Sequence, residues 1–145
     1  MKKINDGTIY LSIAIVTLTV AVILAAISFY SILVVEPKVE RLLADQSSGS
    51  TSHKQAYLLL RDPQLFAGYG YFDAEGITIR NSLSFFDKRI YSGEEIDSTR
   101  TPYLELLLER RKKGSVLGRN TMVFFLFLSL VFFLLAFQEK RAARA

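Results

Sequence analysis

The sequence predicts a membrane protein in which two transmembrane α-helices bracket a small α+β extramembrane domain, a short antiparallel sheet of about three strands with flanking helices. Ile9–Val35 is a run of 27 residues without Asp, Glu, Lys or Arg, and Thr121–Phe137 is a second such run of 17. At about 1.5 Å per residue the first reaches roughly 40 Å, more than the bilayer core of about 30 Å, and the second is near the lower limit for spanning. A chain of 145 residues is too small to bury two such helices on all faces.

The expected order is a short N-terminal tail (1–7), a first span (8–35), an extramembrane domain (36–119), a second span (120–137) and a short basic C-terminal tail (138–145). A cleavable signal peptide ending near Ala26–Ser28 is the alternative to the first span. The apolar run is longer than a signal-peptide core of about 7–15 residues and continues past that site, so we expect an uncleaved helix. Because proline disfavours the helical conformation of the residue before it, we expect a kink or break at Glu36-Pro37.

The middle of the chain is expected to begin with helix and loop. Gln46–His53 is rich in Ser and Gly and is typical of an exposed, flexible loop. Lys54–Pro63 is compatible with a helix that stops at Asp62-Pro63.

A sheet is predicted after Leu65, where aromatic and β-branched residues alternate with turn-forming residues. We expect strands near Phe66–Phe72 and Ile77–Arg80, joined by a type I turn at Asp73–Gly76. A third strand is expected within Leu83–Tyr91.

The last extramembrane element is predicted to be a helix that begins at Thr101-Pro102 and stops at Gly114. Basic residues crowd its end, where positive charge is favourable to the helix dipole. We expect a contact surface for anionic lipid headgroups or an acidic partner at Arg110, Arg111, Lys112, Lys113 and Arg119.

The orientation depends on conflicting signals. The basic residues near the span ends slightly favour a cytoplasmic middle. Lys2 and Lys3 precede the first span, however, and the 84-residue middle exceeds the roughly 60 residues above which loops cross largely regardless of charge. We therefore expect a bacterial inner-membrane protein with both termini in the cytoplasm and an extracytoplasmic domain.

The chain offers few groups for chemistry. It has no cysteine, which excludes disulfides, thiolate catalysis and cysteine-bound metals. Residues 36–119 hold 13 basic and 12 acidic side chains, so the net charge of +4 arises at the membrane flanks and predicts no nucleic-acid partner. His53 is the only histidine, and we expect it to be a solvated loop residue rather than a base or a metal ligand. We expect no enzymatic activity, no cofactor, no metal and no small-molecule substrate.

The spans carry no charge and so show no ion path or proton relay. Small residues at helical spacing predict close helix packing. The expected packing interface comprises Ala14, Thr17, Ala21, Ala25 and Ser28 in the first span and Ser129, Phe132 and Ala136 in the second.

These features favour a non-catalytic accessory, scaffold or assembly subunit of a larger integral membrane complex. Its spans would pack against other membrane subunits, and its domain would dock on them. The alternative is a ligand-sensing two-span module that signals through a partner protein, because eight residues after the second span supply no output domain. A small membrane enzyme is the third alternative and lacks a catalytic constellation.

Overall fold

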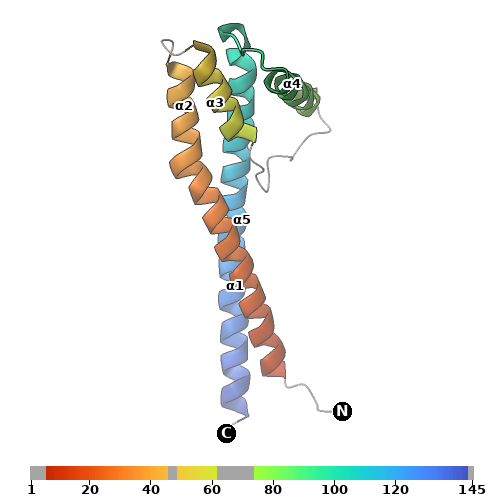
Figure 1. Ribbon diagram of the computed structural model, residues 1–145. Coiled ribbons are helices and arrows are strands. Elements are labelled where there is room, and N and C mark those ends of the chain that lie inside the picture. The colour runs from red at the N-terminus through yellow and green to blue at the C-terminus, as the bar shows by residue number, and fades with distance from the viewer. Residues whose placement is uncertain (1–5, 46–48, 62–73, 144–145) are drawn as a thin grey trace. The chain divides into compact units, whose positions relative to one another are not determined.

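The computed structural model describes residues 6–45, 49–61 and 74–143, and every structural statement below concerns these residues. In chain order the elements are α1 (Asp6–Tyr30), the π-helical turn η1 (Ser31–Val35), α2 (Glu36–Ala44), α3 (Gly49–Arg61), α4 (Ala74–Tyr91), the 3₁₀ turn η2 (Ser98–Arg100) and α5 (Thr101–Ala142) (Figure 1). No strand occurs within the described ranges.

The predicted sheet is wrong, because α4 is a helix over the residues that the Ile77–Arg80 and Leu83–Tyr91 strands would occupy. Ile79, Leu83, Phe86 and Ile90 recur at spacings of three and four and pack together in one core. Their burial on one helical face outweighs the β-propensity of single residues. From Ala74 onward the predicted turn is replaced by the first turn of α4, whereas Asp73 and the predicted strand Phe66–Phe72 lie outside the described residues.

The chain forms two compact units, residues 1–26 with 118–145 (unit 1) and residues 27–117 (unit 2). Unit 1 is an antiparallel pair made by the N-terminal part of α1 and the C-terminal part of α5. The Ser129 hydroxyl donates to the Ala14 carbonyl (2.9 Å), and the Tyr10 and Phe132 rings lie 6.2 Å apart. The two helix segments therefore run antiparallel, because residues later in α1 lie beside residues earlier in α5.

Among the described residues, two helices are long and apolar enough to cross a membrane. They are the continuous helix Asp6–Ala44, which includes η1, and the helix Ser98–Ala142. In the most apolar 18-residue stretch of each helix, only 28% of the residues in the first and 6% in the second are buried. A core helix of a soluble protein is mostly buried. The two long apolar helices therefore fit an integral membrane protein.

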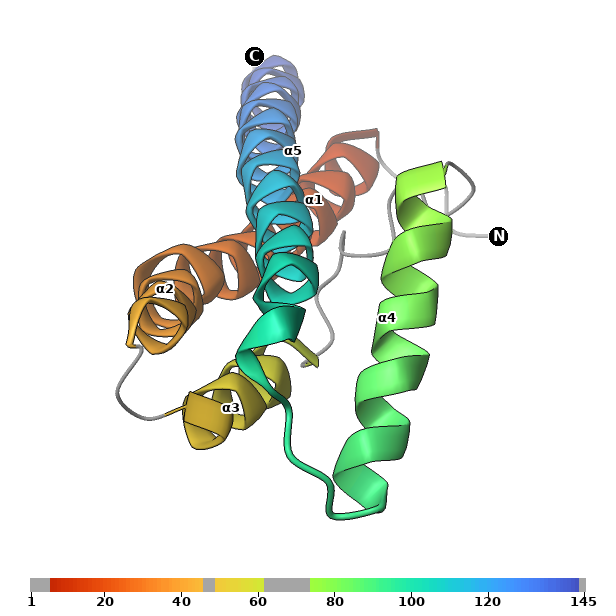
Figure 2. The same cartoon turned by 90° about the horizontal axis from the view of Figure 1, so that it is seen from above.

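Unit 2 is a helical assembly in which α2, α3 and α4 surround the first half of α5 (Figure 2). One core cluster contains Tyr57, Ile79, Phe86, Ile96, Leu104 and Leu107. A second contains Val35, Val39, Ala56 and Leu108. Leu43 and Leu60 pack against both clusters, so the four helices share a continuous apolar interior.

Two predicted interruptions are absent. α5 continues through Gly114, whose φ is not positive, so the expected helix stop there is wrong. Leu107, Arg111 and Ser115 are buried at helical spacing on both sides of it, and this packing outweighs the helix penalty of about 1 kcal/mol for glycine. The expected flexible loop ending at His53 is also wrong from Gly49 onward, where α3 begins; residues 46–48 lie outside the described part.

Candidate functional site around the π-turn

The π-turn η1 is the main backbone irregularity near the end of the first apolar run. Pro37 has no N–H, and its ring would clash with the carbonyl of residue 33 in a regular α-helix. The Glu36 N–H instead bonds to the Ser31 carbonyl, five residues back, while Glu36 keeps helical angles (φ −58°, ψ −51°). The wider turn admits the proline without ending the helix, so of the expected kink or break at Glu36 the break is absent, and the irregularity takes the form of the π-turn η1.

A buried polar cluster lies beside this turn, comprising Ser31, Glu36, Arg111 and Ser115. Their exposed fractions are 9% or less, and Ser31 and Ser115 are fully buried. The Ser115 hydroxyl lies 2.7 Å from Glu36 Oε1, and the Ser31 hydroxyl donates to the same oxygen at 3.1 Å. Arg111 Nε–H donates to Ser31 Oγ at 2.9 Å. The Glu36 carboxylate is thus reached by two hydroxyls, and one of these is held by a guanidinium group.

The cluster joins helices that are distant in sequence. Arg111 also donates from Nη1 to the Leu59 carbonyl in α3 (3.3 Å), so one side chain of α5 contacts both η1 and α3. Burying a polar group without a hydrogen bond costs free energy of folding. Movement of any one of these side chains would break a buried hydrogen bond, so the partners hold one another in place. The hydrogen bonds of this cluster hold η1, α3 and α5 in one register.

The outer side of the same turn is apolar and open. Phe29, Tyr30, Leu33 and Val34 are 43%, 56%, 69% and 47% exposed, and we name them the Phe29–Val34 face. Ser31 and Ser115 have their hydroxyls 3.0 Å apart, so η1 lies level with this part of α5.

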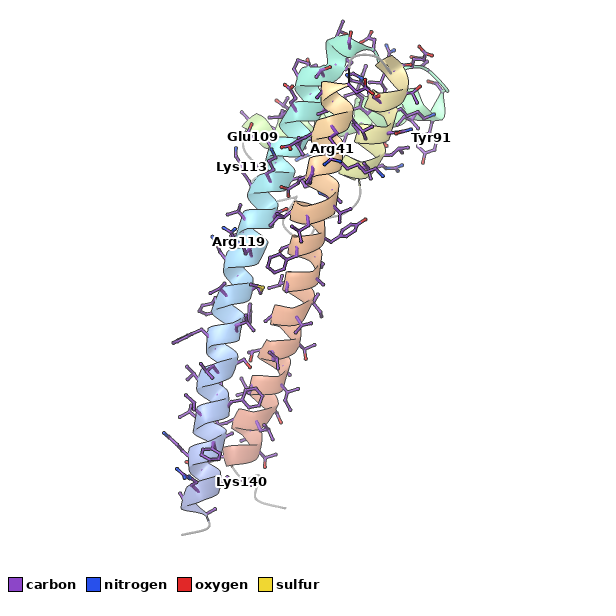
Figure 3. The ribbon with its side chains drawn as sticks, turned by 90° about the vertical axis from the view of Figure 1, so that its left-hand side faces the viewer. Arg41, Tyr91, Glu109, Lys113, Arg119 and Lys140 are labelled. Atoms are coloured by element: carbon purple, nitrogen blue, oxygen red, sulfur yellow. The ribbon has the colours of Figure 1, made fainter. Side chains whose placement is uncertain are left out.

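The neighbouring segment of α5 is ionic. Lys112 pairs with Glu40 of α2. Lys113 pairs with Glu109, one turn away in α5, at 3.3 Å, and both residues are labelled in Figure 3. Arg110 and Arg111 are buried, with 8% and 6% exposed, whereas Arg119 in unit 1 is exposed. The five basic residues predicted as one contact surface therefore have three different environments.

The residues predicted to pack the spans lie in several environments. Ala14, Thr17, Ala21 and Ser129 are buried in unit 1, whereas Ala25, Phe132 and Ala136 are partly exposed there. Ser28 is buried in unit 2. Leu24, which sequence reasoning missed, is also buried, and its spacing of three from Ala21 is the signal that could have found it.

His53 is buried in α3 with 4% of its surface exposed, so the predicted solvated histidine is wrong. Its Nδ1 lies 2.9 Å from the Gly49 carbonyl, and its Nε2 lies 2.7 Å from the Thr101 hydroxyl of α5. A carbonyl can only accept, so Nδ1 carries a proton. His53 thereby ties the start of α3 to the start of α5.

Little in the sequence indicates the buried cluster. Glu36 directly before Pro37 indicated a break, and Arg111 sat within a run of four basic residues. Serines at the ends of two apolar helices were the available signal, because small polar side chains there often bond across helices. Comparison with protein-family models, with curated proteins and with solved structures finds no match to this chain.

Proposed function

We propose that this chain is a non-catalytic accessory or assembly subunit of a larger integral membrane complex. The observation that carries the proposal is the Phe29–Val34 face of unit 2. This face lies within the uncharged run Ile9–Val35, whereas the nearby segment of α5 carries the ion pairs Lys112–Glu40 and Lys113–Glu109.

The ion pairs of unit 2 and its Phe29–Val34 face favour different surroundings. The Lys112–Glu40 and Lys113–Glu109 pairs are about half exposed and favour water or lipid headgroups. Leu33 and Val34 favour an apolar environment. An apolar helix of a partner subunit, placed along η1, would cover Leu33 and Val34 with apolar side chains.

The buried cluster supports this role because it holds the face in a fixed direction. Ser31 lies within η1 and is bonded to Arg111 and Glu36, so rotation of the turn would break several buried hydrogen bonds. A pre-organised face loses little conformational entropy when a partner binds. The proposed location is the bacterial inner membrane, with both tails in the cytoplasm and unit 2 outside.

Photocrosslinking in native membranes tests the proposal. A benzophenone amino acid replaces Leu33 in one variant and Tyr91 in the control, because Tyr91 is also strongly exposed (79%) but lies at the end of α4 (Figure 3). We expect a discrete heterologous product from position 33, absent from position 91, and stoichiometric co-purification of that protein with the unmodified chain. Crosslinks from position 33 to lipid alone, or to a second copy of this chain alone, would contradict the proposal.

A further inference from the structure

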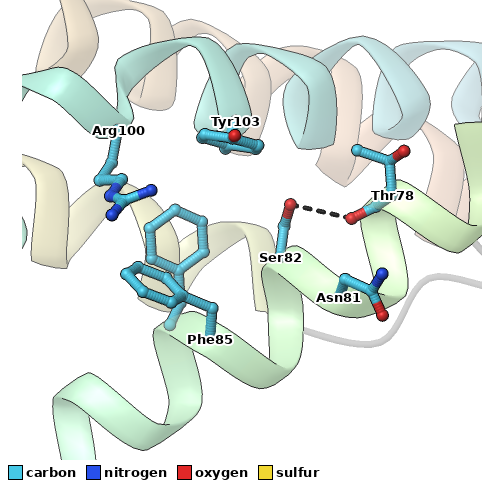
Figure 4. A pocket seen from close by; sticks show the side chains of 7 residues that line it. Thr78, Asn81, Ser82, Phe85, Arg100 and Tyr103 are labelled. Carbon is cyan, nitrogen blue, oxygen red and sulfur yellow. Dashed lines mark hydrogen bonds between the residues drawn. The ribbon is translucent and has the colours of Figure 1, made fainter.

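A cavity of about 380 Å³ lies in unit 2 between α4 and the start of α5 (Figure 4). Its described lining residues are Thr78, Asn81, Ser82, Phe85, Phe86, Arg100 and Tyr103. The volume is in the range of small-molecule sites, which combine apolar walls with a few polar groups. No acidic residue is among these lining residues.

Arg100 supplies the only positive charge among the described lining residues. Its guanidinium carbon lies 4.4 Å from the centre of the Phe85 ring and 5.9 Å from that of Tyr103. Within the described ranges, its guanidinium N–H groups have no hydrogen-bond acceptor and no ion-pair partner. The Phe85 ring positions the planar guanidinium group of Arg100, and the N–H groups of that guanidinium can donate hydrogen bonds to a ligand.

Arg89 provides an internal comparison. It also lies over the Phe85 ring, at 5.0 Å, but its Nη1 pairs with Glu94 at 3.2 Å. It does not line the cavity. Of the two arginines stacked on Phe85, Arg89 forms an ion pair with Glu94, whereas Arg100 lines the cavity and forms no ion pair within the described ranges. The Asp97 carboxylate, which accepts from the Thr99 hydroxyl, lies within electrostatic range of Arg100 but does not line the cavity.

The side chains that line the cavity indicate which shape and polarity of ligand it fits. Phe85, Phe86 and Tyr103 present aromatic surface on both sides of the cavity, with Arg100 and Tyr103 from the α5 side and Phe85 from α4 (Figure 4). The Ser82 hydroxyl donates to the Thr78 carbonyl at 2.9 Å, so its oxygen remains an acceptor. Such walls favour a flat apolar body with one anionic group.

We propose that this cavity binds a small aromatic monocarboxylate, with its carboxylate on Arg100 and its ring between Phe85 and Tyr103. An arginine fork matches a carboxylate through two parallel hydrogen bonds. A single cation balances one negative charge, which favours a monocarboxylate over a phosphate ester carrying close to two. This inference is independent of the proposed membrane partner, and it gives the ligand-sensing alternative a chemical basis.

Fluorine NMR on the full-length chain in detergent micelles tests the inference. The probes are para-fluorobenzoate, para-fluorophenylacetate and para-fluorophenylpropionate, and para-fluorobenzamide is the uncharged control. We expect at least one carboxylate to broaden and shift in a saturable manner, and the amide to bind at least about tenfold more weakly. The absence of saturable binding by all three carboxylates would overturn the proposal.

Two matched variants locate the binding. Arg100→Gln should weaken carboxylate binding at least about tenfold, because the anion then lies beside neutral groups. Arg89→Gln removes the other arginine on the same ring and should leave binding within about twofold of the parent value. Circular dichroism shows whether each variant keeps its helical content. Equal binding by a folded Arg100→Gln variant, or equal losses in both variants, would overturn the proposal.

Discussion

At the scale of single residues, Tyr57 shows how the interior of unit 2 is held together. Its side chain is fully buried, its ring lies 5.1 Å from that of Phe86, and its hydroxyl donates to Asp87 Oδ1 at 2.7 Å. Asp87 also pairs with Arg61 of α3 at 3.3 Å. Burial, followed by the hydrogen bond to Asp87, raises the pKa of Tyr57 above its ordinary value.

Tyr57→Phe keeps the ring and removes this hydrogen bond. We expect the free energy of unfolding to fall by about 1–2 kcal/mol, because Asp87 keeps its pairing with Arg61 and is not left alone. Thermal unfolding in micelles, followed by circular dichroism, measures the change. Tyr103→Phe is the control, because the Tyr103 ring is partly exposed and its hydroxyl makes no hydrogen bond within the described ranges. Equal losses in the two variants would contradict the assignment.

The raised pKa of Tyr57 also predicts the pH dependence of stability. The neutral phenol is favoured in the folded state, so its contribution is fully present below the ordinary tyrosine pKa of about 10. Above that pH the unfolded chain loses the phenol proton first, and stability falls with rising pH. The parent chain should therefore lose more stability than Tyr57→Phe between about pH 9 and pH 11 in matched denaturation series. Parallel pH profiles for the two proteins would sink this idea.

At the scale of elements, the apolar runs were predictable and the connections between them were not. The 27-residue and 17-residue runs predict two long apolar helices, and such helices are present. α4 was mistaken for strands because its aromatic and β-branched residues carry β-propensity, whereas the position of its neighbours decides which periodicity is buried. Pro37 and Gly114 favour an end to their helices, but neither helix ends there, because local preferences of about 1–3 kcal/mol are smaller than the packing around them. Pro37 is accompanied by the π-turn η1 instead of a break.

The buried cluster around η1 is testable as one element. Ser115→Ala removes a hydroxyl that lies 2.7 Å from the buried Glu36 carboxylate, so we expect a loss of about 1–3 kcal/mol in unfolding free energy. Ser12→Ala is the control, because the Ser12 hydroxyl is exposed and bonds only to the Thr8 carbonyl of its own helix. The loss should shrink in a Glu36→Ala background, where the main acceptor is already absent. Fully additive losses would show that the two residues act independently.

At the scale of the whole molecule, the candidate sites arise from residues that the fold brings together from distant parts of the chain. The Ser31–Ser115 contact joins residues 84 positions apart, and the His53–Thr101 contact joins residues 48 apart. No local pattern in the sequence predicts such pairs. Arg111, for example, reads as one of four consecutive basic residues, and only its contacts with Ser31 and Leu59 distinguish it from Lys112 and Lys113.

The orientation of the chain is the property of the whole molecule that the sequence leaves most evenly balanced, and it can be measured directly. Because the chain has no cysteine, single cysteines at Thr51 and Ala142 are unique labels, and both positions are exposed. We expect a membrane-impermeant maleimide to label Thr51→Cys in intact cells. Ala142→Cys should react only after permeabilisation, because Lys2 and Lys3 favour retention of the tails in the cytoplasm. The reverse labelling pattern would place unit 2 in the cytoplasm, where any partner covering the Phe29–Val34 face would have to approach from that side.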